Sequence, residues 1–276
     1  VCLAWDYEPT ARFAEWCSVL RGAGREVWVC PGTSSWRSIT GRTRERRGNL
    51  QAAAREGSAG GATGFLVTDW GDSGHHQQWP VSLAGIAEAA EAAWCGPDAA
   101  YDPRAASVHV FQDQSLATGP WLDELGDLDE PLRRIGGRVG DGEAPTALRN
   151  STVLFNDLFT PIGPGGDEKL RRGTLSVPPA AWRAALERLD ALAARKPRGV
   201  SALVAQELEH TLEVAHLAIN RAIWRRTRNG QPDRIATRLA DVITDHRRLW
   251  LQRCREGGLD DSCGYYARVL EELRTC

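Results

Sequence analysis

Acidic and aromatic side chains gather in one short stretch directly after an apolar segment. Residues 65–68 are apolar or β-branched and predict a short buried strand, and Asp69, Trp70 and Asp72 follow it at once. An apolar strand that is buried on both faces is typical of a parallel sheet. Loops at strand ends are free to carry residues for chemistry rather than for packing. We interpret this stretch as a ligand site; the alternative is a capped turn beside a core tryptophan.

Two other predicted strands end in the same combination of side chains. The first ends at Trp5 and is followed by Asp6 and Tyr7, and the second leads into a hydroxyl-rich loop that ends at Trp36. Tryptophan rings stack on the flat apolar faces of sugar rings, and carboxylates accept hydrogen bonds from sugar hydroxyls. The three strand ends together therefore predict a saccharide site, although any one of the tryptophans taken alone could belong to the core.

Strands and helices alternate in the first third of the chain. Strand-like runs at 1–5, 26–30 and 65–68 are each followed by helical periodicity, at 10–23, 43–56 and 80–94. This alternation predicts a parallel sheet covered by helices over residues 1–96. Residues 97–276 carry only helical signals, so the fold class that we expect is α/β followed by all-α. The helices of this second part are predicted at 97–111, 116–125, 145–159, 178–194, 201–228, 235–253 and from 261 onward.

Motifs at both ends of the chain resemble those of bacterial members of glycoside hydrolase family 20. Two are loops, Cys30-Pro-Gly-Thr-Ser-Ser-Trp36 and Thr68-Asp-Trp-Gly-Asp-Ser-Gly-His75, the second followed by Gln78, Pro80, Val81 and Ser82. The third is Leu249-Trp250-Leu251-Gln-Arg253 with Gly257-Gly258-Leu259-Asp-Asp-Ser262. These β-N-acetylhexosaminidases have a (β/α)8 TIM barrel and a helical C-terminal domain. The resemblance implies that residues 1–96 are the last three βα units of the barrel and that residues 97–276 are the helical C-terminal domain.

The resemblance also implies roles for the side chains at the strand ends. Trp36 and Trp70 would wall the pocket that holds the sugar ring or its acetamido group. Asp69 and Asp72 would accept hydrogen bonds from sugar hydroxyls. These four residues are the main substrate-binding candidates.

Asp6 and Tyr7 are the weaker pair of candidates. In this family a tyrosine hydroxyl often holds the acetamido oxygen, and Tyr7 is the residue of this chain that would do so, unless it faces the helix layer. His75 and His76 would line the rim, but a solvent-facing loop is the interpretation that we prefer for them.

The family's catalytic pair is an adjacent Asp-Glu after the fourth strand of the barrel. The Glu is the general acid, and the Asp orients the substrate's 2-acetamido group, whose carbonyl oxygen attacks the anomeric carbon. This chain has Asp-Glu at Asp123-Glu124, Asp129-Glu130 and Asp167-Glu168, all in the helical half and none after a strand. We interpret them as solvated or capping residues. We therefore assign no catalytic residue, and we expect a fragment that is inactive alone and whose partial barrel leaves open edges.

The composition argues against several other classes of protein. The chain has 276 residues and a formal net charge of −2, so no global field attracts nucleic acid or an anionic membrane surface. No apolar run has the length of a membrane-spanning helix. The 7 cysteines are odd in number and lack CxxC spacing, which argues against a zinc site and favours a reducing cytoplasm. Because the chain lacks Met and begins at Val1, we expect a native start upstream.

One competing metal site lies on the helix predicted at 201–228. Glu207 and His210, like Glu213 and His216, have the spacing of a di-iron carboxylate ligand pair. Such a site needs the pairs on separate helices, whereas here they share one helix and point in different directions. We therefore expect a solvated helix face and no metal.

Three functions stay open at this point. The first is an exo-acting β-N-acetylhexosaminidase, represented here by its C-terminal half, that acts by substrate-assisted retaining catalysis without a cofactor. The second is a non-catalytic carbohydrate-binding relative, and the third is a helical interaction module. The partner that we expect is a glycan or glycoconjugate containing N-acetylhexosamine, and the apolar helix faces also permit a homodimer. An Asp-Glu pair after an apolar strand upstream of Val1 would favour the first.

Overall fold

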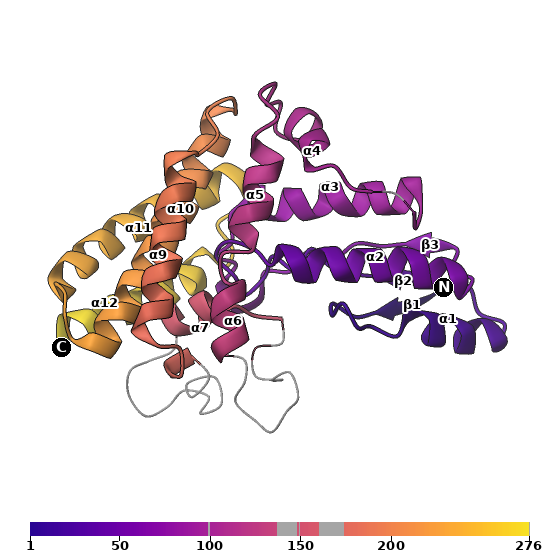
Figure 1. Cartoon of the computed structure of the whole chain (residues 1–276), viewed down its shortest axis with the longest axis horizontal. Coiled ribbons are helices and arrows are strands. Elements are labelled where there is room, and N and C mark those ends of the chain that lie inside the picture. Colours follow the sequence, from indigo (N-terminus) through magenta and orange to yellow (C-terminus); the bar gives the residue numbers. More distant parts are fainter. Residues whose placement is uncertain (99, 137–147, 149, 160–173, 276) are drawn as a thin grey trace.

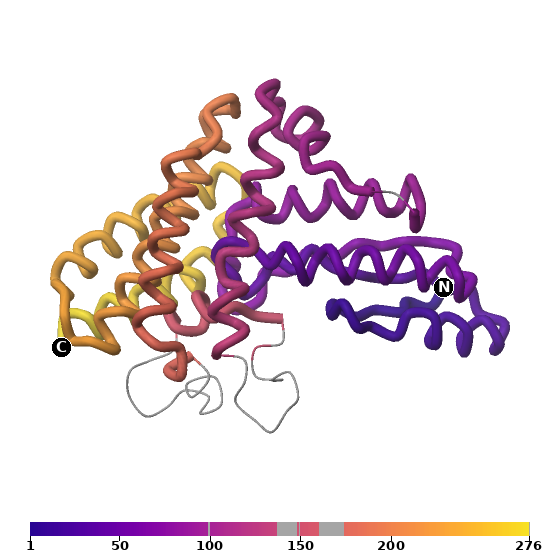
Figure 2. Tube along the Cα trace, viewed as in Figure 1, coloured from indigo at the N-terminus to yellow at the C-terminus, as the bar shows by residue number. Residues whose placement is uncertain are grey.

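The structure is a computed structural model that describes residues 1–98, 100–136, 148, 150–159 and 174–275. The strands and the first helices lie at one end of the molecule, and the long C-terminal helices lie at the other (Figure 1). The chain runs from an N-terminus beside the sheet to a C-terminus among those helices (Figure 2). The described residues therefore follow the predicted order, α/β and then all-α.

Three parallel strands form the sheet, in the order β1 (Cys2–Trp5), β2 (Val27–Cys30) and β3 (Gly64–Phe65). Leu3 pairs with Trp28 across the first strand pair. The prediction that residues 65–68 form a strand buried on both faces is wrong, because β3 has two residues and Leu66 is 39% exposed. Beyond Phe65 the pairing continues only as an isolated bridge between Gly32 and Thr68. In the described part of the chain β3 pairs with β2 alone, and the backbone amides of Leu66 and Thr68 donate to the carbonyls of Val29 and Pro31.

Helices cover one face of this sheet. α1 (Phe13–Gly22) and α2 (Thr43–Ala59) contact the strands. Alternate strand residues, among them Ala4 and Val29, are buried in a cluster with residues of these helices. The opposite face carries Leu3 and Trp5, which are 46% and 61% exposed. The described residues thus form an open sheet with one uncovered apolar face.

The other secondary-structure elements of the described chain are helices. η1 (Asp72–Gly74) leads into α3 (Trp79–Cys95), which packs on α2. The remaining helices are α4 (Pro103–His109), α5 (Thr118–Gly126), α6 (Glu130–Gly136), α7 (Val153–Phe159), α9 (Pro179–Ala194), α10 (Ala202–Thr227), α11 (Pro232–Arg253) and α12 (Leu259–Thr275). Their hydrophobic core also takes in Ile39 and Ala84, so the two parts share buried contacts. The domain boundary after residue 96 stays a prediction.

The helix predictions differ in accuracy. α10 lies within the predicted range 201–228, and the Ser201 side chain caps its first turn. α4 is shorter than the predicted range 97–111, because Asp102 and Pro103 start the helix there, with the Asp102 side chain as cap. α6 was not predicted. Residues 145–147 and 149 of the range predicted as 145–159 lie outside the described residues.

Candidate functional site

The carboxyl ends of the three strands meet at one edge of the sheet, and we call the side chains there the rim. Trp5 ends β1, the loop 31–36 follows β2, and residues 68–72 follow β3. The last two segments are joined by the bridge between Gly32 and Thr68 and by the Thr33 amide, which donates to the Thr68 carbonyl at 2.9 Å. The rim is therefore built from segments far apart in the sequence.

Three tryptophan rings gather around Tyr7 at the rim. The Tyr7 ring centroid lies 4.7 Å from that of Trp36, edge to face, and 5.6 Å from that of Trp5. The Trp70 indole nitrogen donates a hydrogen bond of 2.8 Å to the Tyr7 hydroxyl. A Cβ at Gly32 would lie 2.6 Å from the Trp36 ring and 2.7 Å from the Tyr7 ring, so this position requires glycine.

The rings differ in what they offer to a ligand. Trp36 is 2% exposed and Tyr7 is also buried, whereas Trp70 is 47% exposed and Trp5 is 61% exposed. In this structure Trp36 packs against Tyr7 and presents no ring face to a sugar. Its role as a pocket wall stays a prediction. Trp5 was counted at the first strand end but was not among the substrate-binding candidates, because the strand pattern alone does not say which face of the sheet is uncovered.

The predicted acidic residues also differ in their surroundings. One oxygen of Asp69 accepts hydrogen bonds from the hydroxyls of Thr33 and Ser35, so this carboxylate ties the two loops together. One oxygen of Asp6 accepts from the backbone amide of Tyr7 at 2.6 Å and thereby shapes the turn after β1. Asp72 is exposed on η1. The structure thus brings Tyr7, Asp69 and the tryptophans together and leaves Asp72 at the surface.

Glutamine and serine side chains behind the rim extend this polar network. Gln77 donates from its amide nitrogen to the Trp70 carbonyl at 2.7 Å, and Ser82 lies within 3.2 Å of the Ser35 hydroxyl oxygen. Sequence reasoning missed both residues as parts of the site. Both residues follow the loop motif that ends at His75. This closeness in sequence is the one signal that could have indicated them.

The first Asp-Glu pair belongs to ion pairs of the helical part. Asp123 is held by Arg46 at 2.6 Å and by Arg47 at 2.5 Å, and Glu124 is paired with Arg195. The prediction of a solvated residue is wrong for Asp123, because α2 places two arginines against it. Asp123 is thus held by two arginines, whereas Glu124 is partly exposed, as predicted for a solvated residue.

The second Asp-Glu pair includes the predicted cap. The Asp129 carboxylate accepts hydrogen bonds of 2.8 Å from the backbone amides of Val153 and Leu154, at the start of α7. Burial raises the pKa of Asp129 to about 6. The third pair, Asp167-Glu168, lies outside the described residues.

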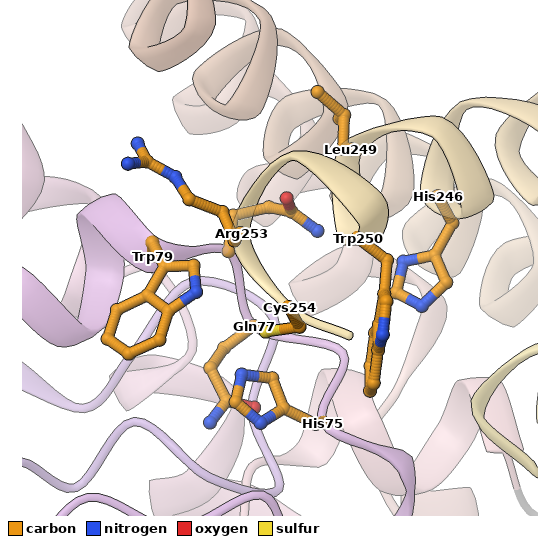
Figure 3. A pocket seen from close by; sticks show the side chains of 9 residues that line it. His75, Gln77, Trp79, His246, Leu249, Trp250, Arg253 and Cys254 are labelled. Atoms are coloured by element: carbon orange, nitrogen blue, oxygen red, sulfur yellow. The ribbon is translucent and has the colours of Figure 1, made fainter. Parts of the chain in front are cut away.

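A small pocket lies between the loop after β3 and α11 (Figure 3). One wall is formed by the loop before α3 and the first residue of α3, and the other by the C-terminal part of α11 and the residue after it. The lining residues are His75, Gln77, Gln78, Trp79, His246, Leu249, Trp250, Arg253 and Cys254. The His75 and Trp250 rings are 5.7 Å apart across it. Arg253, also in the wall, makes two hydrogen bonds of 2.7 Å to Glu207. The pocket is therefore lined by aromatic rings, and its arginine is already paired.

The solvated face that we predicted on α10 is wrong at two positions. Glu207 and His210 are buried, because α11 covers this side of the helix. His76 is buried as well, which corrects the prediction of a solvent-facing loop. Within the described ranges, no group of three or more His, Cys, Asp or Glu side chains is arranged to hold a metal ion.

Comparison with protein-family models finds no match to this chain, and comparison with curated proteins finds none either. Among the helices that the structure describes, none combines the length and the apolar character needed to cross a bilayer. The function therefore has to be argued from the rim itself.

Proposed function

We propose that this chain is the C-terminal part of an exo-acting β-N-acetylhexosaminidase that removes terminal N-acetylhexosamine by substrate-assisted retaining catalysis. The observation that carries the proposal is the rim, where the half-exposed Trp70 ring is held by Tyr7 at the carboxyl end of parallel strands. This edge is where enzymes built from parallel strands and helices bind their substrates. Trp5 adds a second exposed ring.

The uncovered sheet supports the finer part of the proposal, the last three βα units of a TIM barrel. Among the residues that the structure describes, β1 is hydrogen-bonded only to β2, and Leu3 and Trp5 on one face of the sheet are exposed. Further parallel strands would pair with the free edges and bury that face, as in a closed barrel. On this proposal, five βα units precede Val1.

Each rim residue has a task that its contacts permit. Trp70 offers a ring face for the sugar, and Asp72 is exposed and able to accept from its hydroxyls. The Tyr7 hydroxyl accepts from Trp70, which leaves its own O–H to donate to the acetamido oxygen. The general acid and the orienting Asp would come from the preceding strands, since the described Asp-Glu pairs are engaged in ion pairs or capping.

The test is kinetic and uses the whole protein encoded by the gene. We expect it to hydrolyse a chromogenic N-acetyl-β-glucosaminide or galactosaminide, whereas residues 1–276 alone show no turnover. Trp70→Ala should lower kcat/KM by about 10- to 100-fold, because it removes one stacking surface of ~1–3 kcal/mol. Trp94→Ala, which truncates a fully exposed indole on α3, is the control and should leave kcat/KM unchanged. Turnover by residues 1–276 alone would refute the missing-acid argument, and an unchanged kcat/KM in Trp70→Ala would exclude the rim as the active site.

The exposed rings of Trp5 and Trp70 also favour the second candidate, a carbohydrate-binding relative without activity. Ring stacking binds sugars whether or not a general acid is present. Saturable binding of N-acetylglucosamine by the whole protein, weakened by Trp70→Ala and accompanied by no hydrolysis, would decide for this candidate.

A further inference from the structure

Three buried histidine rings stack in a row between the rim loop, residues 72–78, and the helical part. His246 of α11 lies in the middle, and its ring centroid is 5.8 Å from that of His76 and 5.7 Å from that of His210. The neighbouring planes are inclined by only 26° and 25°. His76 belongs to the rim loop and His210 to α10, so the histidine row joins three separate segments.

Ser262, in the first turn of α12, joins two members of the histidine row. Its backbone carbonyl lies 3.1 Å from Nε2 of His76, and its hydroxyl lies 2.8 Å from Nε2 of His246. Three further ring nitrogens of the row, Nδ1 of His76 and of His246 and Nε2 of His210, are buried without a hydrogen-bond partner. A proton added to one of these nitrogens would create a buried cationic N–H with no acceptor, which costs free energy.

A positively charged arginine acts on each histidine of the row. Arg268 of α12 acts on His76, Arg247 of α11 acts on His246, and Arg248 of α11 acts on His210. The carboxylates next to the row in sequence are paired with basic side chains: Glu207 with Arg253, Glu209 with Lys196, and Asp245 with Arg248. Asp157, which lies between Phe155 and Phe159 on α7, pairs with Arg226 at 2.7 Å. The remaining contacts of His76 are aromatic: Phe155, Phe159, Tyr265 and Tyr266.

His75, the residue before His76, lies in the wall of the pocket, which His246 also lines, and it acts on both His76 and His246. Asp69 is the carboxylate that acts on His75. Among the described residues, the groups that act on the row itself are therefore histidines, arginines and neutral rings.

We propose that the histidine row is an acid-sensitive latch, which holds the rim loop on the helical part while its rings are neutral and releases the loop when they are protonated. Gln77, next to His76, donates to the Trp70 carbonyl, so release of the loop also removes this hydrogen bond, while the Trp70 indole keeps its hydrogen bond to Tyr7. The latch is a property of the fold and does not depend on the proposed hexosaminidase activity.

The direction of the pH dependence follows from burial. Burial lowers the pKa of His76 to about 3, of His246 to about 3 and of His210 to about 4. The pKa of an unfolded histidine is about 6.5. Because the folded values lie below this, the stabilisation is fully present above about pH 6.5 and is lost as the pH falls toward 4.

Hydrogen–deuterium exchange on this chain, corrected for the intrinsic pH dependence of exchange, tests the latch. When the pH is lowered from about 7.5 to about 5, we expect the opening equilibrium constant of the rim loop to rise by at least ~10-fold. The opening constant of peptides from the middle of α10 should stay unchanged. His76→Gln combined with His246→Gln should abolish this rise, because the glutamine amides do not titrate. The control is His216→Gln, which changes a histidine paired with Asp190 outside the row and should respond like the wild type.

Two results would overturn the latch: a wild-type loop with equal opening at both pH values, or a double variant with the full wild-type rise. Should the double variant fail to fold, NMR of ring-labelled histidines in the wild type decides instead. The chain has 6 histidines. We expect the three row resonances to stay unshifted down to about pH 5.5, well below the pKa of about 6.5 of an unfolded histidine. Row resonances that titrate near 6.5 would refute the proposal.

Discussion

Asp69 and Asp72 stand three positions apart, and both were predicted to bind sugar hydroxyls. Asp69 already accepts hydrogen bonds from Thr33 and Ser35, whereas Asp72 is exposed. Asp69→Asn should therefore lower the free energy of unfolding by about 1–2 kcal/mol, because hydrogen bonds to a charged group are weakened. Asp72→Asn should change it by less than about 0.5 kcal/mol. Urea unfolding of both variants measures the difference, and equal effects would contradict the loop-tying role of Asp69.

Gly32 shows how one residue sets the geometry of the rim. Ala at this position would push its methyl group into the Trp36 and Tyr7 rings. We expect Gly32→Ala to cost about 1–3 kcal/mol in the free energy of unfolding, as for other overpacked sites, and to alter the near-ultraviolet circular dichroism of the aromatic cluster. Gly22→Ala is the control, because a Cβ there meets nothing within 4 Å. An unchanged spectrum in Gly32→Ala would show that the rings do not depend on this contact.

At the scale of the elements, buried ion pairs join α2 to the helical part. Arg46 is buried between Glu88 of α3, at 2.8 Å, and Asp123 of α5, at 2.6 Å. Glu88→Gln removes one of the two carboxylates that balance Arg46. It should therefore lower the free energy of unfolding by about 3–5 kcal/mol. Glu124→Gln breaks a largely exposed pair with Arg195 and should cost less than about 1 kcal/mol. Thermal or urea unfolding compares the two variants. A small decrease in the free energy of unfolding of Glu88→Gln would mean that water already screens the charges of this network.

The elements also show where sequence reasoning succeeds and where it stops. α10 was predicted almost to the residue, because its apolar stripe is long and Ser201 marks its start. The length of β3 was not predictable, since pairing beyond Phe65 depends on a neighbouring strand rather than on local residues. The burial of His76 was missed for the same kind of reason, because its hydrogen-bond partner Ser262 lies 186 positions away. Local patterns predict elements, but they do not say which loop residues the distant helices will cover.

At the scale of the whole molecule, the uncovered sheet face has a consequence for the isolated chain. Leu3, Trp5 and Leu66 expose large apolar side chains there, and β1 has a free edge. Exposed apolar surface next to an unpaired strand favours association. We therefore expect residues 1–276 to self-associate at micromolar concentration, as measured by sedimentation velocity.

A charge placed on this face should reverse the association without unfolding the protein. Leu3→Glu puts a carboxylate on an already exposed position of β1 and should shift the chain toward the monomer. Val19→Glu is the matched control, because Val19 is equally apolar and is 66% exposed, but it lies on α1, which packs on the other side of the sheet. Equal effects of the two variants would mean that charge alone, and not this face, governs association. A monomeric wild type would contradict the prediction directly, because it would show that an open apolar sheet face is tolerated here without a partner.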